Sequence, residues 1–106
     1  MEGIELQSFK IISSAGDASA LFLKAIQFAE KGLYNEAEAC IEEGNNSLKE
    51  AHHVQTALIQ GEANGEHSNV SLLLIHAQDH LMNAFVYCDL VKSVLKLYKR
   101  LDGNKE

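Results

Sequence analysis

No proline occurs among the 106 residues of this chain, so no residue forces a helix to stop partway along a segment. Apolar residues recur every three or four positions in three stretches, at about residues 8–31, 35–60 and 70–100, and this spacing is typical of amphipathic helices. Gly32 and the polar stretch 61–69 separate them. The sequence therefore predicts an all-α fold, an up-down-up three-helix bundle with short connections.

The starts of two helices and two weak points also follow from local residue types. Asn35 is expected to cap the second helix, and Ser68 or Asn69 the third, because these side chains accept hydrogen bonds from the free N–H groups of a first turn. The Gly-Asp pair at 16–17 predicts a kink or a restart in the first helix. The Gly-Asn-Asn run at 44–46 predicts a kink or an irregularity in the second helix.

Composition limits the classes of protein to which the chain can belong. Apolar residues make up 46% and charged residues 23%, which suits one domain spanning 1–106. The net charge is −6 and no basic cluster is present, so we expect no nucleic-acid partner. No stretch reaches the roughly 20 apolar residues of a membrane span, and there is no Gly-rich phosphate loop. Neither direct membrane insertion nor ATP binding is expected.

The two cysteines point to a reducing compartment. Cys40 and Cys88 show neither a CxxC pattern nor metal-ligand spacing, so we interpret both as small apolar core residues. The first ten residues have neither the basic region nor the apolar run of a signal peptide. We therefore expect a cytoplasmic protein.

The third helical stretch is apolar on two faces when it is placed on a helical wheel. One arc contains Leu73, Leu74, Ala77, Leu81, Ala84, Cys88 and Val91, and the nearly opposite arc contains Leu72, Ile75, Met82, Val86 and Leu90. One apolar stripe is enough for the core of a three-helix bundle. The second stripe must meet something else, and a large exposed apolar stripe typically marks an oligomer interface.

Asp79 falls inside that second stripe, between Ile75 and Met82. An isolated buried carboxylate is costly, so it should be protonated, paired or bound to a metal. If copies of this helix packed around a symmetry axis, their Asp79 side chains would converge and require a divalent cation or a shared proton. The alternative is an Asp79 at the edge of the stripe, half solvated or in a salt bridge.

A narrow polar stripe lies between the two apolar faces and contains His76, His80, Asn83 and Tyr87. His76 and His80 are four residues apart, so their rings are within reach of each other. Three interpretations compete: histidines without a special role, a zinc site, or a nucleophilic histidine that carries a phosphoryl group beside a second, stabilising histidine. Zinc needs a further ligand, and Ala77 occupies the position of the glutamate in an H-E-x-x-H motif.

The two flanking apolar faces favour the nucleophile. An oligomer built on the third helix would place the polar stripe in a groove between subunits, open to a partner protein and dry enough to protect phosphohistidine from water. This hypothesis requires an oligomer rather than a stable monomer.

At these residues the sequence resembles a known family, the enzyme IIA component of the lactose/cellobiose-type sugar phosphotransferase system. The strongest match is HAQDHLM at 76–82. Further matches are AGDA at 15–18, AH at 51–52, QT at 55–56, EANGE at 62–66 and LYKR at 97–100. These matches span nearly the whole chain, and a heptapeptide with two histidines and one aspartate is far more specific than a histidine pair.

The resemblance implies a fold and a chemistry. It implies a homotrimer assembled through the third helix, with a divalent metal ion, magnesium, held by Asp79 at the trimer axis. It also implies phosphate transfer from the histidine-containing phosphocarrier protein to His76 and on to enzyme IIB, for phosphoenolpyruvate-dependent uptake of lactose- or cellobiose-type sugars. His80 and Gln78 would support the phosphoryl site. Relatives often carry arginine where this chain has Ser19, which affects efficiency or partner choice.

Two other functions were weighed against the phosphocarrier. One is a metal-binding helical bundle that uses His76, Asp79 and His80 and has no phosphotransfer role. The other is a phosphorelay domain of two-component signalling, which usually builds four helices and lacks an aspartate three residues after its histidine. The sequence indicates neither the sugar, nor the phosphorylated ring nitrogen, nor the metal.

Overall fold

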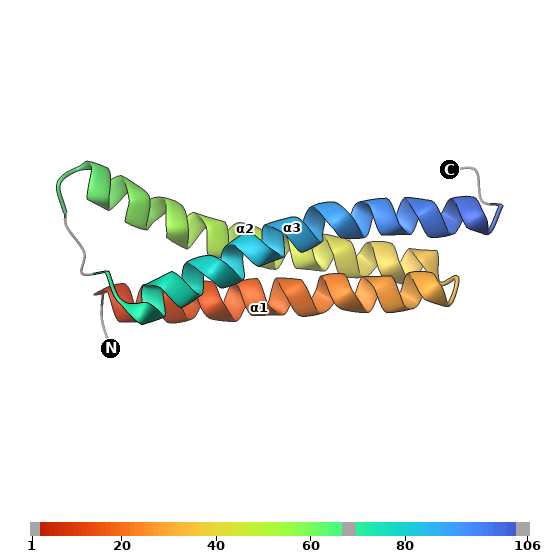
Figure 1. Cartoon of the computed structure of the whole chain (residues 1–106), viewed down its shortest axis with the longest axis horizontal. Coiled ribbons are helices and arrows are strands. Elements are labelled where there is room, and N and C mark those ends of the chain that lie inside the picture. Colours follow the sequence, from red (N-terminus) through yellow and green to blue (C-terminus); the bar gives the residue numbers. More distant parts are fainter. Residues whose placement is uncertain (1–2, 67–69, 104–106) are drawn as a thin grey trace.

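The computed structural model describes residues 3–66 and 70–103, and these residues form three long helices and no strand. Helix α1 runs over Gly3–Glu30, α2 over Tyr34–Ala63 and α3 over Leu72–Leu101. Figure 1 shows α1 and α3 running in the same direction, with α2 antiparallel to both. The molecule is a rod of 54 × 23 × 18 Å. The predicted up-down-up three-helix bundle is confirmed.

The turn between α1 and α2 is closed by backbone hydrogen bonds. The N–H of Leu33 donates to the carbonyl of Phe28 at 2.9 Å, and the N–H of Gly32 donates to Ala29 at 3.0 Å. This is the Schellman pattern, which requires a left-handed residue, and Gly32 has φ of 75°. The predicted stop at Gly32 is therefore confirmed.

The expected caps of α2 and α3 are replaced by other residues. The turn fixes Leu33 as the N-cap of α2 without a side-chain hydrogen bond, so Asn35 lies inside the first turn and the prediction that it caps was wrong. Ser68 and Asn69 lie outside the described residues. The cap of α3 is Ser71, whose hydroxyl accepts a hydrogen bond from the N–H of Leu74 at 3.1 Å.

Helices α1 and α2 continue unbroken through 16–17 and 44–46, so the restart expected at 16–17 was wrong, whereas a kink at either place stays a prediction. Packing explains why both helices continue. Ala15 and Ala18 are fully buried and hold α1 against the other helices on either side of Gly16. Gly44 is itself buried, and it provides the space that the ring of Phe22 fills.

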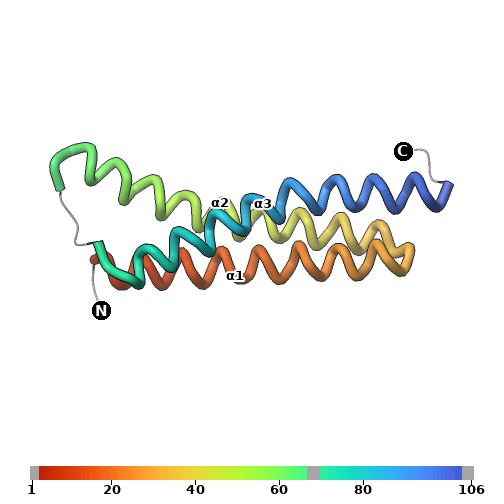
Figure 2. Tube along the Cα trace, viewed as in Figure 1, coloured from red at the N-terminus to blue at the C-terminus, as the bar shows by residue number. Residues whose placement is uncertain are grey.

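One core joins all three helices. It consists of Ile11, Ala15, Ala18, Phe22, Ala25, Ala29, Ala37, Cys40, Ile41, Leu48, Ala51, Ala77, Leu81, Ala84, Cys88, Val91 and Leu95. Four alanines of α1 lie on this face, so the helices approach closely, and Phe22 is the largest fully buried side chain. Both cysteines are free and buried, as predicted. Figure 2 shows the C-terminal end of α2 diverging from the beginning of α1 and α3.

The far end of the bundle is tied by Tyr34 at the start of α2. Its hydroxyl hydrogen-bonds the carbonyl oxygen of Tyr98 at 3.1 Å and a carboxylate oxygen of Asp102 at 3.0 Å. Partial burial, followed by the hydrogen bond and charge of Asp102, raises the pKa of the Tyr34 hydroxyl above its usual value. Lys99 of α3 also forms an ion pair with Glu38 of α2. These contacts fix the end of the rod opposite the histidine pair.

The contact between Gly44 and Phe22 generates a stability prediction. A Cβ atom at position 44 would lie 2.6 Å from Cε1 of Phe22, so the ring, which is fully buried, would have to shift within the core. Gly44→Ala should therefore lower the free energy of unfolding by about 1–3 kcal/mol, although alanine is the better helix former. Urea unfolding followed by circular dichroism measures the change.

Gly16→Ala is the matched control, because a Cβ at position 16 meets nothing within 4 Å. It should stabilise the protein by about 0.5–1 kcal/mol. Equal effects of the two substitutions would contradict the close packing of Phe22 on Gly44.

Candidate functional site

Helix α3 exposes the second apolar face that its sequence predicts. The residues of this face, called here the α3 stripe, are 82% (Leu72), 49% (Ile75), 46% (Met82), 53% (Val86) and 56% (Leu90) exposed. On the opposite side of α3, Ala77, Leu81, Ala84, Cys88 and Val91 are buried in the core. The prediction of two apolar faces is therefore confirmed, and only one of them is covered within a single chain.

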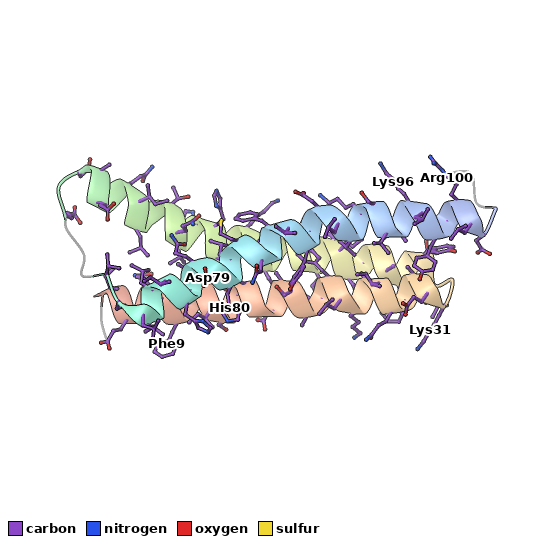
Figure 3. All side chains as sticks on the ribbon, in the orientation of Figure 1. Phe9, Lys31, Asp79, His80, Lys96 and Arg100 are labelled. Atoms are coloured by element: carbon purple, nitrogen blue, oxygen red, sulfur yellow. The ribbon has the colours of Figure 1, made fainter. Side chains whose placement is uncertain are left out.

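Asp79 lies in the α3 stripe and is exposed in the single chain. Figure 3 shows Asp79 and His80 next to each other in the first half of α3. No hydrogen bond or ion pair to Asp79 is seen among residues 3–66 and 70–103. Of the alternatives for Asp79, a salt bridge is therefore not formed with the described part of the chain, whereas a solvated carboxylate agrees with its exposure in a single chain.

His76 and His80 form the close pair that their spacing predicts. The two Nε2 atoms are 3.1 Å apart, the ring centroids are 4.4 Å apart, and the ring planes are nearly perpendicular at 86°. At this distance one Nε2–H donates and the other Nε2 accepts, so at least one ring has a lone pair on Nε2. His76 is exposed and His80 is half-buried. His76 can therefore contact a partner protein, while His80 can donate a hydrogen bond to it or accept one from it.

Gln78 lies on the other flank of α3 from His76. Its Oε1 accepts a hydrogen bond of 2.8 Å from Nε2 of Gln55 on α2, and Gln55 is only 8% exposed. Its role at the phosphoryl site stays a prediction, but within one chain the structure brings Gln78 to Gln55. Sequence reasoning missed this pair. The available signal was a glutamine on the apolar face of α2, one turn after Ala51.

Three further residues considered from the sequence, His52 and His53 of α2 and Ser19 of α1, lie away from the histidine pair in the hydrogen-bond pattern. His52 meets the ring of Phe85 edge-on, with centroids 5.5 Å apart, at a shallow cavity of about 330 Å³ between α2 and α3. His53 is exposed. Ser19 is half-buried on α1. None of these residues is joined to the His76–His80 pair by a hydrogen bond within the described ranges.

The donor set around Asp79 does not hold a metal within one chain. Among the described residues, no group of three or more His, Cys, Asp or Glu side chains is placed to bind an ion. A magnesium ion prefers several oxygen ligands in octahedral geometry, and one exposed carboxylate supplies too few. A site at Asp79 therefore requires carboxylates from further copies of the chain.

None of the three helices, within the residues described, is long and apolar enough to cross a membrane.

Comparison with known proteins gives consistent results. The sequence pattern of the family described as "PTS system, Lactose/Cellobiose specific IIA subunit" matches residues 6–99. The chain is 44% identical over 99 residues to a lactose-specific EIIA component of Staphylococcus aureus, covering 93% of this chain and 96% of the relative. It is 39% identical over 100 residues to the lichenan-specific IIA component of Bacillus subtilis, covering 94% and 91%.

Solved structures show the same similarity. The cellobiose-specific enzyme IIA of Bacillus anthracis superposes with a TM-score of 0.93 at 40% identity, covering 99% of this chain and 97% of that one. A chain from the complex of IIA(Chitobiose) with HPr of Escherichia coli superposes with a TM-score of 0.82 at 34% identity, covering 96% and 99%.

Proposed function

Because this chain belongs to the lactose/cellobiose-specific IIA subunits of the sugar phosphotransferase system, we propose that its own phosphate carrier is His76. In this proposal His76 accepts phosphate from the histidine-containing phosphocarrier protein, HPr, and passes it to enzyme IIB in the cytoplasm. Family membership and the similarity to a IIA chain in complex with HPr support this route. The sugar belongs to the lactose or cellobiose type.

The observation that carries the proposal is the exposed His76 with its Nε2 atom 3.1 Å from that of His80. When His80 is the donor of this pair, Nε2 of His76 is unprotonated; once their hydrogen bond breaks, its lone pair can turn outward and attack the phosphorus atom of the donor. The new N–P bond forms as the donor's bond to phosphorus breaks, and that electron pair returns to the donor. His80 Nε2–H is then placed to donate to a phosphoryl oxygen. The second transfer reverses these roles toward the acceptor.

The α3 stripe supports a homotrimer. Five apolar side chains, each 46% to 82% exposed, follow one side of α3; such a face is typical of a protein–protein contact, and we propose that other copies of α3 cover it. Three copies around a threefold axis would bring three Asp79 carboxylates together. We propose that a divalent cation, magnesium, is bound there, since clustered carboxylates repel one another without a cation or shared protons. The ion would neutralise the carboxylates at the axis, and it would not take part in the chemistry at His76.

The alternative of a metal-binding bundle finds less support. His76, Asp79 and His80 form no three-ligand group in the described part of one chain. The two histidine rings are hydrogen-bonded to each other. Asp79 lies on the face of α3 that carries the stripe, and not on the flank that carries the histidines.

The first experiment tests His76 as the carrier. The protein is incubated with the general phosphotransferase components and radiolabelled phosphoenolpyruvate, and we expect one acid-labile, base-stable phosphate per chain. His76→Ala should abolish the label, whereas His53→Ala, which removes an exposed histidine of α2, should keep it. Label that persists in His76→Ala would sink the proposal.

The second experiment tests the stripe as the subunit interface. Val86→Glu places a charge in the centre of the stripe and should convert trimers to monomers in sedimentation equilibrium, because a buried unpaired carboxylate costs several kcal/mol. Leu23→Glu is the control, since Leu23 is almost as exposed as Val86, at 52% against 53%, but lies on α1. A trimer that survives Val86→Glu would exclude this face as the interface.

The third experiment separates the metal from the assembly. Asp79→Leu should keep the trimer and lose the bound metal, because replacing clustered charges with apolar volume is often neutral or stabilising. Elemental analysis of the purified protein measures the metal, and sedimentation measures the trimer. Dissociation of Asp79→Leu into monomers would show that the ion, rather than the apolar stripe, holds the axis together.

A further inference from the structure

We propose that the cavity between α2 and α3 binds a small phosphorylated sugar, at a site separate from His76. The cavity, called here the α2–α3 cavity, has a volume of about 330 Å³ and is lined by Asn45, Leu48, Lys49, His52, Phe85 and Lys92. The choice of a phosphate group rests on these residues alone. The choice of a sugar also rests on the proposed function, because a sugar phosphotransferase system delivers its phosphate to the imported sugar.

Two facing helices form the walls of the α2–α3 cavity. Its residues on α2 are three or four positions apart and those on α3 are seven apart, so each set lies on one face of its helix. Two contacts join these faces. The rings of His52 and Phe85 meet edge-on with centroids 5.5 Å apart, and Sγ of Cys88 donates to Oδ1 of Asn45 at 3.0 Å. These contacts hold the two walls at a fixed spacing.

The polar groups of the α2–α3 cavity are suited to an anion. Among residues 3–66 and 70–103, no carboxylate lines it, although the net charge of the chain is −6. Neither Lys49 nor Lys92 forms an ion pair or a side-chain hydrogen bond with the described part of the chain. Two lysines at one cavity repel each other unless an anion binds between them.

Asn45 and the two lysines match a phosphate monoester in particular. The acceptor oxygen of Asn45 is occupied by Cys88, so its amide hydrogens are left to donate. A phosphate monoester carries about −1.5 to −2 charges at neutral pH and offers three acceptor oxygens. Lys49 and Lys92 together supply two positive charges, so the phosphate is neutralised where it binds.

The floor of the α2–α3 cavity is apolar. Leu48 is 6% exposed and Phe85 is half-buried, whereas both lysines are exposed at the rim. Ligand pockets typically combine apolar and aromatic walls with a few polar groups that fix the orientation of the ligand. The C–H face of a sugar ring packs on such a floor. The volume is near the lower end of the usual range of roughly 300–1,000 Å³, which suits a monosaccharide phosphate rather than a dinucleotide.

The α2–α3 cavity does not overlap the proposed phosphate carrier. Phe85 is nine residues further along α3 than His76, which corresponds to about 14 Å along the helix axis. Phe85 also faces α2, whereas His76 lies on the other flank of α3 and is hydrogen-bonded to His80. A phosphorylated sugar, the product of the system, can therefore bind here while His76 carries phosphate.

The experiment is a titration of the full-length protein with glucose 6-phosphate in a phosphate-free buffer, followed by the amide chemical shifts of isotope-labelled protein. Glucose, inorganic phosphate and AMP are titrated in parallel. We expect glucose 6-phosphate to bind most tightly and glucose not to bind measurably. Shift changes should be confined to residues 45–52 and 85–92.

Four results would overturn the proposal. Absence of binding by glucose 6-phosphate would remove the site. Inorganic phosphate binding as tightly as glucose 6-phosphate would remove the sugar, and tighter binding of AMP would assign a nucleotide instead. Shift changes centred on His76 would place the anion at the phosphate carrier.

Lysine variants test the contacts to the phosphate group. Lys49→Ala and Lys92→Ala should each weaken the binding of glucose 6-phosphate roughly 10- to 100-fold, the usual effect of losing a hydrogen bond to a charged group. Lys96→Ala is the matched control, because Lys96 is exposed one turn beyond Lys92 on α3 but does not line the α2–α3 cavity. An equal loss in Lys96→Ala would show only a general attraction between charges and would contradict a built site.

Phe85→Leu separates the sugar from the phosphate. Leucine keeps the floor apolar but removes the flat ring, so glucose 6-phosphate should bind more weakly while the affinity for inorganic phosphate stays the same. Equal weakening of both would show that Phe85 only shapes the cavity, against its proposed contact with the sugar.

The titrations are independent of phosphate transfer, because they contain neither phosphoenolpyruvate nor a carrier protein. His76→Ala should bind glucose 6-phosphate as the wild type does. Loss of binding in His76→Ala would contradict two separate sites. Radiolabel retained by His76→Ala would instead refute the proposed function and leave the anion site standing.

Discussion

Helix α3 has two apolar faces that both need to be buried, and the rest of the structure depends on this constraint. Its inner face completes a core in which the alanines of α1 and the single ring of Phe22 bring three helices close together. Its outer face, from Leu72 to Leu90, is left largely exposed by the described part of the chain. Polar residues are therefore confined to the two narrow flanks between these faces. His76 and His80 occupy one flank and Gln78 the other, so the apolar packing separates the chemistry.

Periodic features were predictable from the sequence, and contacts between distant residues were not. The three helices, the stop at Gly32 and the meeting of His76 with His80 all follow from spacings of three or four residues and from one glycine. The cap expected at Asn35 failed because the backbone of the preceding turn had already fixed Leu33 as the boundary. Helix α2 continues through 44–46 although its local helix propensity is weak there, since Gly44 makes room for Phe22 in the core.

The site follows the same rule. The histidine pair and the outward position of Asp79 could be read from one helix. The hydrogen bond between Gln55 and Gln78 joins residues 23 positions apart on different helices, and no periodic pattern encodes such a pair. It changes how Gln78 is understood, because a residue two positions from His76 in sequence turns out to be anchored to α2. Closeness along a helix is a poor guide to closeness in space when the separation is two residues.

The spacing of the exposed side chains along α3 has a geometric consequence. Ile75, Val86 and Leu97 are eleven residues apart in succession, and so are Asp79, Leu90 and Leu101; the five apolar members are 49% to 75% exposed. An eleven-residue repeat corresponds to about 3.67 residues per turn, close to the period of an undistorted helix and slightly above it. Copies joined along this line would lie almost parallel, with a weak right-handed supercoil in place of the left-handed coil of heptad proteins.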